Sequence, residues 1–255
     1  MIGPPSLDRS FGPALEAHLL GRLDFARCLA LQQHLAEQLS QRRDGQVRLL
    51  LCEHPDVITV GRGGSPADVQ LSCGLLRSGQ IDVRWVSRGG GCLVHTPGQL
   101  AVYPIFPLFS HGLKLGEYLE RLQEGVRRAL AELAIKGQTD RGRHGIWGRT
   151  GQLVAIGVAV RNWVAYHGAF VNVCPRMGLF QLVETEPLHG TRMSCLVAER
   201  GGPVRMTRVR AELIRHLAAA FGCDRYHLHT GHPWLTGAAR RAPPAIRGRR
   251  EPPCL

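Results

Sequence analysis

Two long apolar runs separated by only two residues constrain the fold of this chain most. Gln152 to Val160 and Trp163 to Val173 are rich in valine, alanine and aromatic residues, and Arg161-Asn162 stands between them. A connection this short joins antiparallel neighbours, so the pattern predicts a β-hairpin. Further strands are predicted at Val47 to Cys52, Val57 to Val60, Ile81 to Val86 and Leu100 to Ile105. Pro104 and Pro107 favour an edge position or a strand end for the last of these.

Three segments have the apolar spacing of amphipathic helices: residues 24–43 ending at Gly45, residues 115–133 closed by Lys136-Gly137, and Thr207 to Phe221. Helices and strands follow one another too unevenly for a doubly wound sheet. The predicted fold class is therefore α+β, with a mixed, largely antiparallel sheet flanked by helices. We expect one domain over residues 1–235 and an Arg/Pro-rich tail over residues 236–255, disordered beyond about Pro243.

Composition is ordinary for a globular protein that buries a full core: 255 residues, 44% hydrophobic and 20% charged. Asp8, Arg9 and Glu16 stand where a secretory signal needs an uninterrupted apolar run. No window approaches the roughly 18 apolar residues of a membrane span. The sequence predicts a cytoplasmic monomer without membrane contact.

The net charge of +12 suits an acidic partner, either a nucleic acid or an acidic carrier protein. Genomic composition explains the charge equally well, because Lys114 and Lys136 are the only lysines of the chain. The tail contributes Arg240, Arg241, Arg247, Arg249 and Arg250 but no interleaved aromatic residues, which disfavours nucleic acid.

The cysteines lack CxxC spacing and are therefore predicted to be free thiols, with no metal site and no cofactor. They are Cys28, Cys52, Cys73, Cys92, Cys174, Cys195, Cys223 and Cys254. Cys223, His227, His229 and His232 are close enough to supply mixed metal ligands, but their spacing matches no standard zinc pattern.

A glycine-rich segment is the strongest candidate for a binding site. Arg88-Gly89-Gly90-Gly91 is followed by His95 and by Pro97-Gly98-Gln99-Leu100. Glycine lets backbone N–H groups approach a ligand, and arginine adds a planar set of donors. Such a loop can wrap a small anionic or carbonyl-bearing group, although many glycine triplets are only turns.

Four ordered blocks extend this motif. They are residues 54–61 (HPDVITVG), the Arg88 to Leu100 segment, Ala155-Ile156-Gly157 and residues 167–173 (HGAFVNV). Together they resemble the octanoyltransferases, also called lipoate-protein ligase B, over roughly residues 20–222. The resemblance implies a single domain of the biotin/lipoate ligase type. It also implies transfer of an octanoyl group from acyl carrier protein to a lysine on a lipoyl domain of a 2-oxoacid dehydrogenase or of a glycine cleavage H-type protein.

Residue by residue, the resemblance implies that three segments bind the acyl substrate. These are Arg88, Gly89, Gly90, Gly91, Cys92, Leu93, Val94 and His95; Ala155, Ile156 and Gly157; and Gly168, Ala169 and Phe170. Small residues on paired strands leave room for an acyl chain, whose methylenes each contribute about 0.8 kcal/mol when buried. Close packing of the sheet is the alternative explanation for the second and third segments.

The chain departs from the family at both catalytic positions. The family uses a cysteine that takes the acyl group as a thioester and a lysine that lowers the thiol pKa. Here Gln152 occupies the lysine position, three residues before Ala155, and an ungapped count places Glu186 at the cysteine position. Glutamine carries no charge and accepts no proton from a thiol.

Two hypotheses follow for the activity. In the first, Glu186 or His95 acts as a general base, so that an acceptor amine attacks the acyl thioester directly. In the second, the chain is a catalytically inactive relative, a pseudoenzyme that binds acylated carrier protein or a lipoyl domain. The sequence therefore leaves open whether the protein is an enzyme.

Overall fold

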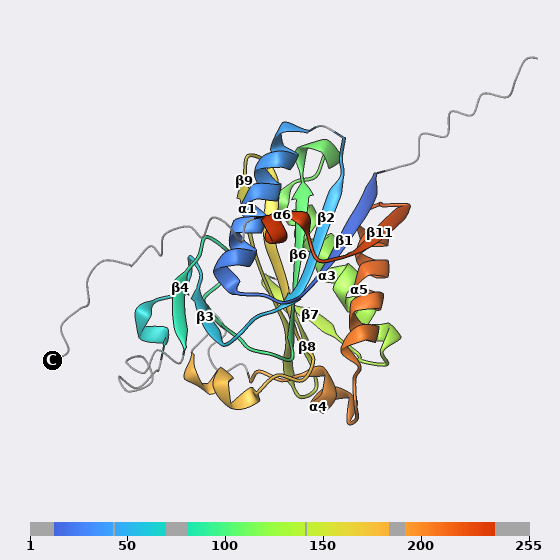
Figure 1. Ribbon diagram of the computed structural model, residues 1–255. Coiled ribbons are helices and arrows are strands. Elements are labelled where there is room, and N and C mark those ends of the chain that lie inside the picture. The colour runs from blue at the N-terminus through green and yellow to red at the C-terminus, as the bar shows by residue number, and fades with distance from the viewer. Residues whose placement is uncertain (1–12, 43, 70–80, 141, 184–191, 238–255) are drawn as a thin grey trace, which may run out of the picture.

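An eight-stranded mixed sheet runs through the centre of the protein in the computed structural model, which describes residues 13–42, 44–69, 81–140, 142–183 and 192–237 (Figure 1). Its strand order is β11-β1-β2-β6-β10-β9-β8-β7. The strands are β1 (Ala14–Arg22), β2 (Val47–Glu53), β6 (Gln99–Pro107), β7 (Gln138–Asp140), β8 (Arg143–Gly148), β9 (Gly151–Arg161), β10 (Val164–Asn172) and β11 (Arg225–Thr230).

Parallel pairing is confined to one end of this sheet, where β1 pairs with both β2 and β11. The strand pairs from β2 through β7 are all antiparallel. The predicted α+β class with a mixed, largely antiparallel sheet is confirmed. The sequence predicted no strand at β1, β7, β8 or β11.

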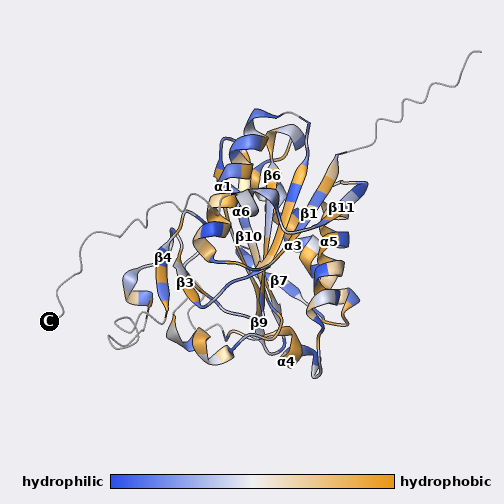
Figure 2. Cartoon of the chain, viewed as in Figure 1, coloured by the Kyte–Doolittle hydropathy of each residue, from blue (hydrophilic) through white to orange (hydrophobic). Residues whose placement is uncertain are grey.

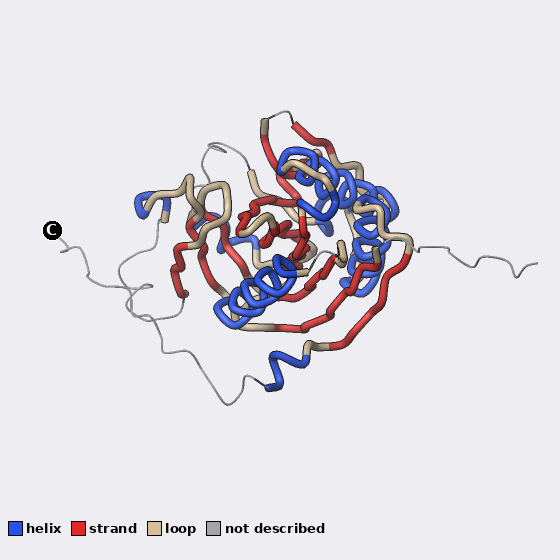
Figure 3. Tube along the Cα trace, turned by 90° about the horizontal axis from the view of Figure 1, so that it is seen from above, coloured by secondary structure: helices blue, strands red, loops and turns tan. Residues whose placement is uncertain are grey.

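Helices cover both faces of the sheet (Figure 3). Helix α1 (Phe25–Gln41) packs on β6 and β10, and the short α6 (Pro233–Gly237) contacts α1. Helices α3 (Leu115–Glu132) and α5 (Met206–Ala220) pack against each other. They cover an apolar cluster that includes residues of β2, β6 and β9. All three predicted helices are present, and α4 (Leu196–Arg200) adds a short one. Figure 2 shows apolar residues concentrated along the central strands and the inner helix faces.

A second, three-stranded sheet stands beside the first. It has the order β4-β3-β5, formed by β3 (Val57–Val60), β4 (Asp82–Trp85) and β5 (Cys92–His95). Three short 3-10 helices complete the described elements: η1 (Pro66–Asp68), η2 (Phe109–His111) and η3 (Met177–Leu182). The small sheet packs against residues of η3, and its loop between β4 and β5 contains the Arg88 glycine motif.

The predicted hairpin is confirmed, with its turn shifted by one residue. Asn162 and Trp163 both have left-handed backbones, with φ of 49° and 59°. Two consecutive left-handed residues are the requirement of a type I′ turn, whose twist matches that of paired strands. Arg161 accordingly belongs to β9 and pairs with Val164.

Of the two positions predicted from Pro104 and Pro107, the edge is wrong, because β6 lies between β2 and β10, whereas Pro107 does stand at the strand end. Opposite Pro104 the paired register of β10 is interrupted between Ala165 and Ala169. There His167 has φ of 58°, and its N–H donates to Gln32 Oε1 at 2.9 Å instead of to β6. A proline is tolerated inside this sheet because the partner strand bulges away and needs no N–H from it.

The predicted tail over residues 236–255 lies outside the described residues, except for Thr236 and Gly237 at the end of α6. Within the described ranges, no helix has both the length and the apolar content that membrane crossing requires.

Candidate active site

The Arg88 guanidinium lies inside the glycine loop and binds the backbone of that loop. Arg88 is 1% exposed, and Nη1 donates to the carbonyl oxygens of Gly89 and Gly91 at 3.0 and 2.9 Å. Nη2 donates to the carbonyl and hydroxyl oxygens of Thr59 on β3 at 2.9 and 2.8 Å. Burial lowers the pKa of Arg88 to about 10, so the group is charged at neutral pH. The sequence predicted that the Arg88 donors bind a ligand. In the structure, all four of their hydrogen bonds are made within the protein.

The loop rests directly on strand β9. Gly89 N–H donates to the carbonyl oxygen of Val158 at 2.9 Å, and Gly63 N–H donates to the carbonyl oxygen of Gly90 at 3.1 Å. A Cβ atom at Gly157 would lie 2.7 Å from the Gly89 carbonyl oxygen, closer than packed atoms tolerate. Glycine at position 157 is therefore required for the close approach of loop and strand.

A cavity of about 330 Å³ opens between this loop, β9 and the start of α3. Its volume is at the lower end of the range of about 300–1,000 Å³ for small-molecule sites. The lining is formed by Arg62, Arg88, Gly89, Gly90, Gly91, Leu93, Leu115, Leu119, Gly142, Arg143, His144, Gln152, Ala155, Ile156, Gly157 and Val158. Leucine, isoleucine, valine and alanine provide apolar walls, and three arginines supply positive charge.

The structure divides the sequence-predicted site residues into two groups. Arg88, Gly89, Gly90, Gly91, Leu93, Gln152, Ala155, Ile156 and Gly157 meet at this cavity. Cys92, Val94, His95, Gly168, Ala169 and Phe170 are described by the structure but do not line it. Glu186 lies outside the described residues. The sequence reading assigned no site role to Arg62, Leu115, Leu119, Arg143 or His144, because only the fold brings α3 and β8 to the loop.

Gln152 is fully buried at the wall of the cavity. Its side-chain Nε2 donates to the carbonyl oxygen of Val154 at 3.3 Å, and its Oε1 has no hydrogen-bond partner within the protein. The backbone around Gln152 is held by the segment before α4, since Gln152 N–H donates to Arg192 and Ser194 N–H donates to Gln152. A buried amide oxygen without a partner costs about 1–3 kcal/mol, which a bound hydrogen-bond donor would recover.

His95 belongs to a buried hydrogen-bond network. Its Nδ1 lies 2.9 Å from Gln99 Oε1, while Gln99 Nε2 donates to the Asn172 side chain at 2.9 Å. Nδ1 must therefore carry the proton, and Nε2 accepts from the Thr59 hydroxyl at 2.8 Å. Burial first, and then the nearby His54 and Arg88, hold the pKa of His95 well below its ordinary value. His95 is thus a neutral link behind the Arg88 loop.

The network continues to the backbone of Gln152. Asn172 Nδ2 donates to the carbonyl oxygen of Ser194 at 3.0 Å, and Ser194 pairs with Gln152. The sequence reading assigned no role to Thr59, Gln99 or Asn172. These residues could have been found from the sequence, because each lies inside one of the blocks that carry the family resemblance.

The third segment predicted to bind the substrate, Gly168 to Phe170, packs in the core under α1. Phe170 is 1% exposed, and its ring lies 4.7 Å from the His95 ring and 5.7 Å from the Tyr103 ring, measured between centroids. A Cβ atom at Gly168 would lie 2.2 Å from the Val102 carbonyl oxygen. Close approach of strands, the alternative weighed from the sequence, therefore explains Gly168.

Comparison with known proteins identifies the family of this chain. Residues 24–218 match the family described as the lipoyl protein ligase A/B catalytic domain. The chain therefore belongs to this family. Among its curated relatives, an octanoyltransferase of Geotalea uraniireducens is 35% identical over 194 residues, covering 76% of this chain and 87% of the relative. An octanoyltransferase of Roseiflexus sp. is 34% identical over 223 residues, covering 86% and 92%.

A solved structure agrees on the fold. The bipartite lipoate protein ligase from Thermoplasma acidophilum, studied with its E2 lipoyl domain, superimposes with a TM-score of 0.66 at 17% identity, over 90% of this chain and 91% of that chain. The predicted lipoate ligase-like fold is confirmed.

Proposed function

We propose that this protein transfers an octanoyl group from acyl carrier protein to a lysine of a lipoyl domain. The observation that carries the proposal is the cavity that brings the Arg88–Gly91 loop, the Ala155–Gly157 segment and Gln152 together. In the proposed step, the lysine nitrogen attacks the thioester carbonyl carbon. An amide bond forms, the carbon–sulfur bond breaks, and the carrier thiol leaves with the proton lost by the amine.

The loop is suited to hold the thioester carbonyl. The carbonyl oxygens of Gly89, Gly90 and Gly91 are all bonded, either to Arg88 Nη1 or to N–H groups of residues 61–63. With these oxygens held away from the ligand, the loop offers N–H groups other than that of Gly89, which is bonded to Val158, and such groups stabilise the negative charge that develops on a carbonyl oxygen under attack. The apolar walls would accommodate the acyl chain.

Gln152 is proposed to orient the attacking amine through its unpartnered Oε1. An amide is no base, so the proton must go elsewhere. Of the two bases expected from the sequence, His95 has both ring nitrogens bonded within the protein and does not line the cavity. Glu186 is therefore the base that we propose.

The charge of the cavity lining supports an acidic donor protein. Arg62 and Arg143 both contribute to the lining, and a basic surface attracts an acidic carrier. Lipoyl domains are proposed as acceptors because the related archaeal ligase was studied with its E2 lipoyl domain.

The second candidate function is binding of acylated carrier protein or lipoyl domains without catalysis. It is favoured by one observation, namely that the family's lysine position holds the neutral Gln152. The two candidates share the cavity and differ only in turnover.

An acyl-transfer assay by mass spectrometry separates the two. Octanoyl-lysine on a lipoyl domain should appear above background with the natural protein, and Glu186→Gln should lower the rate about 100-fold, because a positioned base contributes at least that factor. The matched control is the double variant Gln152→Lys with Glu186→Cys, which restores the family's pair. Product from the double variant alone would identify the natural protein as a binding protein.

Gly157→Ala should damage both the site and the fold. The added Cβ would press on the Gly89 carbonyl oxygen at 2.7 Å and on Arg88 Cδ at 3.2 Å, so the loop must move away from β9. We expect a loss of about 1–3 kcal/mol in the free energy of unfolding and weaker binding of octanoyl carrier protein. Gly116→Ala on α3 is the control, since its Cβ meets nothing within 4 Å. Equal melting temperatures for the two variants would contradict the packing argument.

A further inference from the structure

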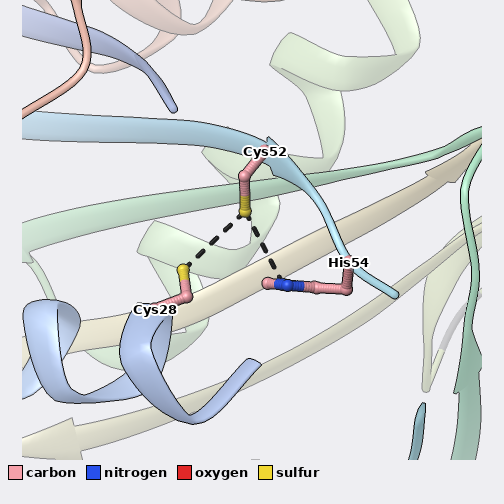
Figure 4. Close-up of side chains that lie close together, drawn as sticks. All are labelled: Cys28, Cys52 and His54. Atoms are coloured by element: carbon pink, nitrogen blue, oxygen red, sulfur yellow. Dashed lines mark hydrogen bonds between the residues drawn. The ribbon is translucent and has the colours of Figure 1, made fainter. Parts of the chain in front are cut away.

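Two cysteines and a histidine from separate elements meet in the core beneath α1 (Figure 4). Cys28 lies in the first turns of α1, Cys52 near the end of β2, and His54 directly after β2. The Cys28 and Cys52 sulfurs are 3.7 Å apart, and Cys52 Sγ lies 3.6 Å from His54 Nε2. All three ligand atoms lie within 4.8 Å of one another, and none of these residues lines the cavity described above.

These separations match those around a tetrahedral zinc ion. Bonds of about 2.3 Å to sulfur and about 2.0 Å to nitrogen set two sulfurs about 3.8 Å apart and a sulfur and a nitrogen about 3.5 Å apart. The observed 3.7 and 3.6 Å agree within a few tenths of an ångström. A disulfide requires about 2.05 Å between the sulfurs, so the two sulfurs would have to move closer before one could form.

The surrounding hydrogen bonds orient the ligand atoms. His54 Nδ1 lies 2.7 Å from the Leu23 carbonyl oxygen, which only accepts, so Nδ1 carries the proton and Nε2, 3.6 Å from Cys52 Sγ, is the nitrogen with a lone pair. This arrangement is the usual one behind a metal-bound histidine. Gln32 Nε2 donates toward Cys28 Sγ at 3.7 Å, a bond that favours a thiolate. In this structure Nε2 accepts from the Tyr103 hydroxyl at 2.8 Å, so this hydroxyl must turn aside when an ion binds.

Charge balance selects the metal. Cys28 and Cys52 are 0% exposed and His54 is 1% exposed, so an uncompensated charge would be costly. A divalent zinc ion with two thiolates and a neutral imidazole has no net charge. Monovalent copper with the same ligands would leave one negative charge.

We propose that Cys28, Cys52 and His54 bind a structural zinc ion that ties α1 to β2. Two thiols lose their protons to solvent when the ion binds, and no electron is transferred. Because the site is closed, the ion enters as the chain folds. The site is independent of the proposed acyl transfer, since its ligands lie outside the cavity.

Metal analysis of the purified full chain tests the proposal. Protein prepared without chelators, or refolded with zinc chloride, should contain one zinc per chain by plasma mass spectrometry. Cys28→Ser and Cys52→Ser should lose it, whereas Cys223→Ser, at a buried cysteine outside the cluster, should retain it. Protein refolded with cobalt(II) should show a thiolate-to-cobalt charge-transfer band that Cys52→Ser abolishes.

A second measurement needs no variant. Refolding the natural protein with zinc rather than with chelator should raise its melting temperature by about 5–10 °C. Absence of stoichiometric zinc after refolding in zinc would overturn the proposal, as would stoichiometric copper in its place. An intact mass lower by two hydrogens, reversed by reductant and lost in Cys28→Ser, would replace it with a disulfide.

Discussion

Arg88→Met should lower the free energy of unfolding by about 3–5 kcal/mol and abolish acyl transfer. The methionine side chain fills the same space but removes the four hydrogen bonds to Thr59, Gly89 and Gly91. Each buried oxygen left without a donor costs about 1–3 kcal/mol, partly recovered when the loop opens to water. Urea unfolding followed by circular dichroism measures the loss.

Two further variants isolate the cause. Arg88→Lys keeps the charge but not the planar set of donors, so it should recover only part of the loss. Arg62→Met is the control, because Arg62 also lines the cavity but its side chain is exposed. A loss below about 1 kcal/mol in Arg88→Met would mean that the glycine backbone alone holds the loop.

Acidification should destabilise the fold through buried neutral histidines. Burial, and then the charge of Arg88, lower the pKa of His167 to about 3, and His95 is held well below its ordinary value by burial, His54 and Arg88. A histidine of lowered pKa contributes stability that is fully present above its unfolded value of about 6.5 and is lost as pH falls toward the folded value. By pH 5 His167 should remove about 2 kcal/mol of stability, and protonation of His95 should add to this loss.

Urea midpoints between pH 7.5 and pH 5 test this prediction. His167→Asn should remove about 2 kcal/mol of this pH dependence, and asparagine tolerates the left-handed backbone at this position. His227→Gln on the exposed β11 is the control and should leave the slope unchanged. Unaltered stability at pH 5 in the natural protein would show that these rings take up protons in the fold as readily as in the unfolded chain.

Local pattern was sufficient for most of the secondary structure. The hairpin of β9 and β10 and the helices α1, α3 and α5 could be predicted because apolar periodicity and short connections act between neighbours in the chain. Strands β1 and β11 could not, since they pair in parallel although about 200 residues apart, and β11 is polar and exposed. The edge position expected from Pro104 was wrong for the same reason. A central strand tolerates this proline only because another strand bulges at His167.

The amino-acid sequence by itself determined the fold class, the family and two of the segments that line the cavity, because these depend on ordered blocks and periodicity. Only the tertiary structure decided which way side chains face. The Arg88 donors turn to backbone oxygens, the His95 nitrogens close a buried network, and Cys28 meets Cys52 across two elements. These directions and contacts are decided by packing, because most buried polar groups must find a partner and several of those partners, such as Thr59 for Arg88 and His95, lie on other elements.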